Sequence, residues 1–114
     1  MNLVWQTSAD TRESATEALH AAGAEVRERR GFEPMTTIVV VAGVVAISRA
    51  LASLFRDTRF RGVLIDLTKD PVEIREMPGW DRRQVLLIGS NGPQFHEFTS
   101  DAELTALISS VKGA

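Results

Sequence analysis

The sequence predicts one small α+β domain that spans residues 1–114, with a mostly antiparallel sheet and helices packed on one of its faces. Two kinds of pattern support this fold class. Some segments alternate apolar and polar residues, or are short apolar runs between turn residues, as strands are. Other segments repeat apolar residues at i, i+3, i+4 and i+7, as amphipathic helices do. In chain order these patterns give β-α-β-α-β-β-β-β-α.

The N-terminal part predicts a strand, a helix and a second strand. Residues 3–7 alternate as a strand does, and Asp10 stands three residues before Glu13, which is the spacing of a helix-capping box. Gly23 suits the end of that helix, because glycine readily adopts positive φ. The charged alternation over residues 24–29 predicts an edge strand, since charges discourage further strand pairing. The helix presents an apolar face of Ala15, Ala18, Leu19 and Ala22.

The C-terminal half predicts two hairpins and a helix. The first hairpin joins its two strands through a turn at residues 68–71, and the second through a turn at residues 90–93. Ser100 and Glu103 form a capping box that opens the last helix. The predicted strands are residues 63–67, 72–76, 84–88 and 94–98, and the helix buries Leu104, Leu107, Ile108 and Val111.

The run from Met35 to Phe55 is the most apolar part of the chain and contains one charge, Arg49. Residues 38–45 are β-branched enough for a buried strand, but the continuation has helical spacing and the whole run exceeds normal strand length. We therefore predict one long central helix, with Pro34 in its first turn. Cations that oppose the negative end of the helix dipole follow it, at Arg56, Arg59 and Arg61.

This apolar helix suggests an interaction surface. One sheet cannot easily cover a helix that is apolar all round, so we expect its free side to contact a second copy or a partner protein. The simpler alternative is that its small side chains only seat the helix on its own sheet. The predicted surface is a stripe of small residues with two flanking arginines, namely Ala42, Gly43, Ala46, Ala50, Ser53, Arg49 and Arg56.

A membrane-inserting helix over residues 35–55 is the alternative interpretation. The run is long enough to cross a bilayer, and the arginines that follow it suit a cytoplasmic side. Arg49 argues against a span, because it interrupts the apolar segment in its second half.

Composition limits the partners and the chemistry. A net charge of −2 gives no electrostatic reason to expect nucleic acid. The chain has no cysteine, which excludes thiol catalysis and cysteine-based zinc sites and fits a reducing compartment. The N-terminus lacks the pattern of a secretory signal, so we expect a cytoplasmic protein. No cofactor is predicted.

Catalytic or metal-binding patterns are weak. The histidines are His20 and His96, and they lack the short spacing of a zinc site. The turn at residues 89–92 does not match a nucleophile elbow, since Ile88 stands where the first glycine is needed and a strand follows. A small enzyme that uses Asp66, His96 or Ser90 would need those side chains in one pocket. We expect no enzymatic activity.

Residues 42–61, AGVVAISRALASLFRDTRFR, carry a family resemblance. A short β-α-β start, an apolar central helix that ends in arginines, and following hairpins together resemble the effector-associated constant component family of bacterial conflict systems. The second hairpin and the capped helix over residues 84–113 depart from that pattern. The resemblance implies a non-enzymatic adaptor or assembly component, encoded beside effector proteases, with no catalytic residues to transfer.

The sequence therefore predicts a protein-binding module of a bacterial defence system. We expect it to form a homo-oligomer or to dock an effector protein through the central helix. Membrane association and a small enzyme are the two alternative classes.

Overall fold

The computed structural model describes residues 1–32 and 35–112 of the chain. Over these residues it contains three helices and seven strands, which confirms the α+β class. The order differs from the prediction by one additional strand. The elements are β1 (Asn2–Ser8), α1 (Arg12–Ala21), β2 (Glu25–Phe32), β3 (Met35–Val41), α2 (Val44–Leu54), β4 (Gly62–Asp66), β5 (Val72–Met77), β6 (Gln84–Gly89), β7 (Gly92–Glu97) and α3 (Asp101–Lys112).

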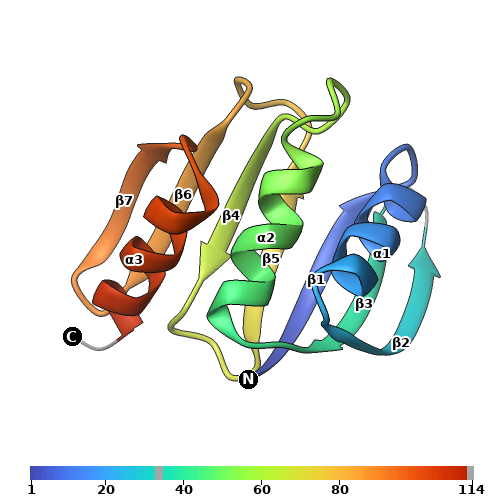
Figure 1. The fold of residues 1–114 in the computed structure, drawn as a ribbon, viewed down its shortest axis with the longest axis horizontal. Helices are drawn as coiled ribbons and strands as arrows, with labels where there is room; N and C mark the ends of the chain where they lie inside the picture. Colours follow the sequence, from blue (N-terminus) through green and yellow to red (C-terminus); the bar gives the residue numbers. More distant parts are fainter. Residues whose placement is uncertain (33–34, 113–114) are drawn as a thin grey trace.

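All the described strands form one sheet, in the order β2-β3-β1-β5-β4-β6-β7 (Figure 1). Four of its neighbouring pairs are antiparallel, including both predicted hairpins, β4–β5 and β6–β7. Two pairs, β1–β5 and β4–β6, are parallel. The sheet is thus mixed. Parallel neighbours require crossover connections, which a chain of hairpins does not supply.

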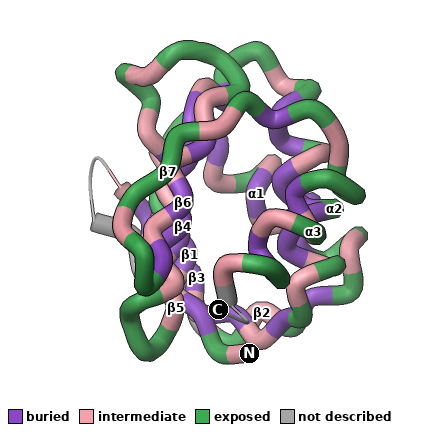
Figure 2. The backbone as a smooth tube through the Cα atoms, turned by 90° about the vertical axis from the view of Figure 1, so that its left-hand side faces the viewer, coloured by how far each residue is buried: buried purple, intermediate pink, exposed green. Residues whose placement is uncertain are grey.

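The helices cover one face of the sheet, as predicted, and leave the other face without a helix (Figure 2). The central helix α2 packs between its two neighbours, α1 on one side and α3 on the other. In Figure 1, α1 lies over the β1–β3 side of the sheet and α3 over the β6–β7 side. The face of the sheet opposite the helices is therefore open to a partner.

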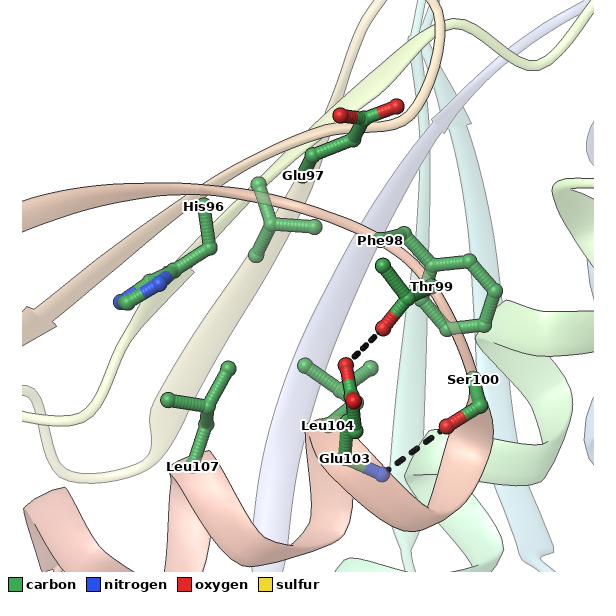
Figure 3. A pocket seen from close by; sticks show the side chains of 9 residues that line it. His96, Glu97, Phe98, Thr99, Ser100, Glu103, Leu104 and Leu107 are labelled. Atoms are coloured by element: carbon green, nitrogen blue, oxygen red, sulfur yellow. Dashed lines mark hydrogen bonds between the residues drawn. The ribbon is translucent and has the colours of Figure 1, made fainter.

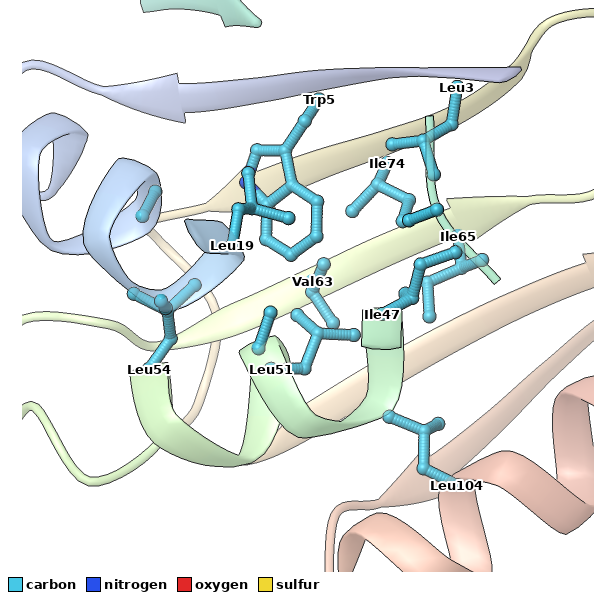
Figure 4. Packing of buried hydrophobic residues seen from close by; sticks show 14 of the residues in the cluster. Leu3, Trp5, Leu19, Ile47, Leu51, Leu54, Val63, Ile65, Ile74 and Leu104 are labelled. Carbon is cyan, nitrogen blue, oxygen red and sulfur yellow. The ribbon is translucent and has the colours of Figure 1, made fainter. Parts of the chain in front are cut away.

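The hydrophobic core lies between the sheet and the three helices (Figure 4). Trp5 at its centre is fully buried, and its ring lies between α1 and the sheet. Every second residue of the inner strands faces this core, as the pleat of a strand requires. The apolar side of α2 contributes Ile47, Leu51 and Leu54, and the sheet contributes Leu3, Val63, Ile65 and Ile74.

The predicted long helix over residues 35–55 is wrong. Residues 35–41 form strand β3, which lies between β1 and β2, and the helix α2 begins only at Val44. The β-branched run Thr36–Val41 is buried at alternate positions, which is the pattern of a strand. Gly43 separates the two elements with an extended backbone, φ −83° and ψ 169°. The predicted position of Pro34 lies outside the described residues.

This correction removes the basis of the membrane alternative. The described helices include none that is both long enough and apolar enough to cross a bilayer. The 11 residues of α2 are well short of the ~20 that a transmembrane helix needs.

Several local predictions are confirmed. The charged strand β2 lies at one edge of the sheet. Gly23 ends the first helix with φ +86°. Ser100 Oγ accepts a hydrogen bond from the Glu103 backbone N–H at 3.2 Å, as an N-cap does, although the Glu103 carboxylate pairs with Thr99 instead of completing the box.

Candidate interaction surface

The seven residues predicted as one interaction surface lie in different environments. Ala42 and Ala50 are buried, with 7% and 0% of their surface exposed. Ala46 is half-buried. The exposed members are Gly43, Arg49, Ser53 and Arg56. The structure therefore does not bring the seven residues together on an open face.

One residue of the predicted stripe, Ser53, lies beside the neighbouring helix α1. Ser53 lines a hollow of about 330 Å³ together with Ser14, Ala18 and Ala21 of α1. The other small residues of the stripe, Ala42 and Ala50, belong to the buried core of the chain. Arg56 lies elsewhere, in a hollow of about 260 Å³ beside the start of α3.

An ion pair stands at the rim of the α1–α2 hollow. Arg59 donates a hydrogen bond to Asp57 Oδ2 at 2.8 Å, and Ser14 donates one to the same oxygen at 3.5 Å. The side-chain bond from Arg59 is the main reason that the pKa of Asp57 falls from 3.8 to about 2. Because this pair lies at the surface, it contributes little to stability.

The uncovered face of the sheet carries a row of apolar side chains. Side chains alternate between the two faces of a strand, and Val63, Ile65, Val85 and Leu87 point into the core. Leu64 and Leu86 therefore point to the uncovered face. The register pairs Leu64 with Leu86, and Leu86 with Phe95 of the edge strand β7. These three side chains form one row across β4, β6 and β7.

Trp80, in the loop between β5 and β6, extends this row. Its ring lies 5.8 Å from the ring of Phe95, at an angle of 54°. Trp80 packs over Gly62, where an added Cβ would approach Trp80 Cβ to 2.9 Å. Arg61 Nε donates to the Trp80 carbonyl at 3.2 Å and so holds the loop. We call Leu64, Trp80, Leu86 and Phe95 the sheet patch.

Phe95 is the most exposed member of the patch, with 62% of its surface accessible. Among the large apolar side chains that the structure describes, Val45 of α2 is the other exposed one, at 51%. Leu64, Leu86 and Trp80 are half-buried. The exposed apolar surface is therefore concentrated at the sheet patch, whereas Val45 stands apart on the helical side.

The charges next to the patch are paired with one another. Arg75 of β5 donates to Glu73 Oε1 and to Gln6 Oε1, both at 2.8 Å. Lys69 approaches the other oxygen of Glu73 at 3.7 Å. Because each of these charges has a partner of opposite sign, a protein that covers the sheet patch would not bury an unpaired charge from this network.

The patch ends at an edge of the sheet. Among the strands of residues 1–32 and 35–112, β7 has β6 on one side and no strand on the other. A shallow hollow of about 300 Å³ runs beside Phe95, His96 and Glu97, with Arg82 and Arg83 also at its wall. The opposite edge, β2, differs because it carries the charged side chains of Glu25 and Arg27. Charges of this kind protect an edge from pairing, and β7 has fewer of them.

A buried polar cluster lies at the carboxyl ends of the parallel strands β1 and β5. Glu76 Oε2 accepts hydrogen bonds from Thr7 Oγ1 at 2.8 Å, from the Ser8 backbone at 2.6 Å and from Thr11 Oγ1 at 2.5 Å. Glu76 is 1% exposed. The three donors tie the start of α1 to β5, so the cluster has a structural role that accounts for its residues.

The candidate catalytic side chains do not converge. Asp66 accepts hydrogen bonds from the backbone and hydroxyl of Thr68 at 3.0 and 2.5 Å, and so stabilises the turn after β4. Alternation places Asp66 on the uncovered face of the sheet, but His96 pairs with Val85 and faces α3. Ser90 lies in the exposed turn between β6 and β7.

The space next to His96 is small. His96, Leu104, Leu107 and neighbouring residues surround a cavity of about 10 Å³ between β7 and α3 (Figure 3). A cavity of this size holds about one water molecule, so it does not accommodate a substrate.

Within residues 1–32 and 35–112, no group of three or more histidine, aspartate and glutamate side chains is placed to hold a metal ion. Comparisons with protein-family models, with characterised proteins and with solved structures found no match.

The sheet patch was not predicted from the sequence. Phe95 was assigned correctly to a strand, but its exposure depends on β7 being an edge, which follows from the sheet order. The local pattern pointed the other way, because an apolar residue between the polar residues Gln94 and His96 is expected on the buried face of a strand.

Proposed function

We propose that this chain is a non-enzymatic protein-interaction module that binds through the sheet patch and the adjoining edge of β7. The observation that carries the proposal is the exposed ring of Phe95, which lies against Trp80 and continues into Leu86. Monomeric proteins rarely expose large contiguous apolar patches, and large patches of this kind mark interaction sites.

The composition of the patch supports a protein partner. Aromatic side chains are enriched among the residues that dominate binding energy, because they bury a large area with few rotatable bonds. Trp80 is also held in place before binding, by its packing on Gly62 and by the Arg61 hydrogen bond. A pre-positioned ring loses less conformational entropy when a partner covers it.

The biological setting that we propose comes from the family resemblance of residues 42–61. It suggests an adaptor or assembly component of a bacterial defence system, acting in the cytoplasm beside an effector protein. The proposal moves the interaction surface from the central helix to the sheet, since α2 packs between α1 and α3.

Site-specific photo-crosslinking tests this surface. The photoreactive residue p-benzoylphenylalanine replaces Phe95 in one variant and Val45 in another, and each variant is irradiated both as pure protein and in the cells that produce it. Phe95 and Val45 are the exposed large apolar residues of the described chain, so they form a matched pair on opposite sides of the molecule.

We expect protein adducts from position 95 and few from position 45. Adducts that form mainly from position 45 would return the surface to α2. No adduct from either position, together with a monomeric mass, would contradict the proposed function.

A further inference from the structure

We propose that the partner of β7 is a second copy of this chain, which pairs with it antiparallel so that Phe95 faces Phe95 across a two-fold axis. The two sheets then continue into one another. This inference deepens the proposed interaction function and rests on it, because it names the occupant of the same surface.

The backbone of β7 is oriented for this pairing. The Phe98 N–H donates to the Arg83 carbonyl at 2.7 Å, and this pair continues the β6–β7 register. Hydrogen-bonded positions alternate along an antiparallel pair. Gln94 and His96 therefore bond inward to β6, and the backbone groups of Phe95 and Glu97 point outward at the free edge.

One register satisfies all the outward backbone donors. With Phe95 opposite Phe95, the two Phe95 residues exchange both of their backbone hydrogen bonds. Each Glu97 N–H then donates to the carbonyl of Pro93 in the second copy. Pro93 has no N–H of its own, so no outward donor of residues 93–97 is left without an acceptor.

The side chains agree with that register. The two Phe95 rings become direct cross-strand neighbours, with a Trp80 ring outside each, and aromatic cross-strand pairs stabilise sheets. Glu97 faces Pro93 rather than the other Glu97, so like charges do not oppose each other. A shift by two residues in either direction would place Gln94 against Gln94, or His96 against His96, and would separate the Phe95 rings.

The other edge of the sheet is unsuited to the same contact. β2 carries Glu25 and Arg27 at its start, and its register with β3 shifts between Val26 and Glu28. Charges and bulges both protect an edge strand from further pairing. The contrast favours a closed dimer through β7 over an open filament that uses both edges.

Cysteine crosslinking tests the register, because the chain has no cysteine of its own. Gln94→Cys and His96→Cys are prepared as separate variants and then mixed under mild oxidation. In the proposed register, residue 94 of one copy faces residue 96 of the other at a non-hydrogen-bonded position, where the Cα atoms are about 4.5 Å apart. That distance is within disulfide range.

We expect the mixture to form a covalent dimer at least ten-fold faster than either variant alone. Each variant alone places its thiols diagonally, about 7–8 Å apart, which is beyond unstrained disulfide geometry. Ser53→Cys, exposed on α2, is the matched control for random collision, and circular dichroism confirms that each variant is folded.

Fast crosslinking of one variant by itself would contradict this register. Equal, slow rates in all samples would contradict the dimer. If the dimer fails but p-benzoylphenylalanine at position 95 still captures another protein, the proposed function survives and the inference about a second copy does not.

Discussion

Glu76 shows how a single buried side chain connects distant parts of this fold. One of its carboxylate oxygens accepts hydrogen bonds from Thr7, Ser8 and Thr11, which lie 65 or more residues away in the sequence. These bonds join the end of β1 and the start of α1 to β5. Since β1 and β5 are one of the parallel pairs, Glu76 stabilises the contact between the two halves of the sheet.

Replacing Glu76 with leucine should destabilise the protein strongly. The substitution removes the acceptor for two buried hydroxyls and one backbone N–H, and each unsatisfied buried group costs about 1–3 kcal/mol. We expect the free energy of unfolding to fall by about 3 kcal/mol or more in urea denaturation. Glu76→Gln keeps one acceptor oxygen and should lose about 1 kcal/mol. Equal stability of the two variants would contradict this role.

The Asp57–Arg59 pair predicts a response to acid. The hydrogen bond from Arg59 lowers the pKa of Asp57 from 3.8 to about 2 in the folded chain. A lowered folded pKa adds stability above the unfolded pKa, and that stability is lost as the pH falls from 3.8 towards 2. Asp57→Asn should therefore be slightly less stable than the parent at pH 7 and should lose less stability over that acid range.

Urea denaturation of both proteins at several pH values measures this effect. Asp81, which is exposed and is not part of this network, provides the control variant Asp81→Asn. Parallel stability curves for the parent and Asp57→Asn would contradict the assignment.

At the scale of elements, the sequence predicted most of the fold because periodicity is a local property. The hairpins β4–β5 and β6–β7 follow from alternation and turn residues, and the helices α1 and α3 from their apolar spacing. The predicted cap at Asp10 does not form, since α1 begins after Thr11, which makes no side-chain cap hydrogen bond. The central run was misassigned because a buried strand followed by a buried helix has no polar positions to mark the change of period. Gly43 was the available signal of the break, and it was placed in the helix instead.

The position of α2 between two helices predicts very different losses of stability for two neighbouring substitutions. Ala50 is fully buried, so Ala50→Arg should bury an unpaired charge and lower the free energy of unfolding by about 3–5 kcal/mol. Ser53 is exposed, and Ser53→Arg should change stability by less than about 0.5 kcal/mol. Thermal unfolding measures both, and a well-folded Ala50→Arg variant would contradict the buried position of this face.

The packing of Trp80 on Gly62 predicts a further effect on stability. Gly62→Ala would place a Cβ within 2.9 Å of Trp80 Cβ and 3.1 Å of the Gln84 carbonyl, so the β5–β6 loop must move. We expect a loss of about 1–3 kcal/mol, as for other overpacked sites. Gly79→Ala, in the same loop, meets no atom within 4 Å and serves as the control. A similar stability for both variants, by urea denaturation, would contradict the proposed packing.

At the scale of the whole molecule, the helices bury one face of the sheet and leave the other open. The proposed interaction surface could not be predicted from the sequence for this reason, since it depends on which strand lies at the edge and on which face the helices cover. Leu64, Leu86 and Phe95 come from three strands that only the sheet order brings into one row. The predicted surface on α2 was based on the length of a helix that the chain does not form.

The molar mass of the purified chain, measured by light scattering over a range of concentrations, tests whether the chain dimerises through the sheet patch. We expect a mass that rises from one chain towards two, a loss of this rise in Phe95→Ser, and no change in Val45→Ser. A rise that is lost in Val45→Ser and kept in Phe95→Ser would contradict the sheet patch as the interaction surface. A mass of one chain at every concentration would contradict the β7 dimer.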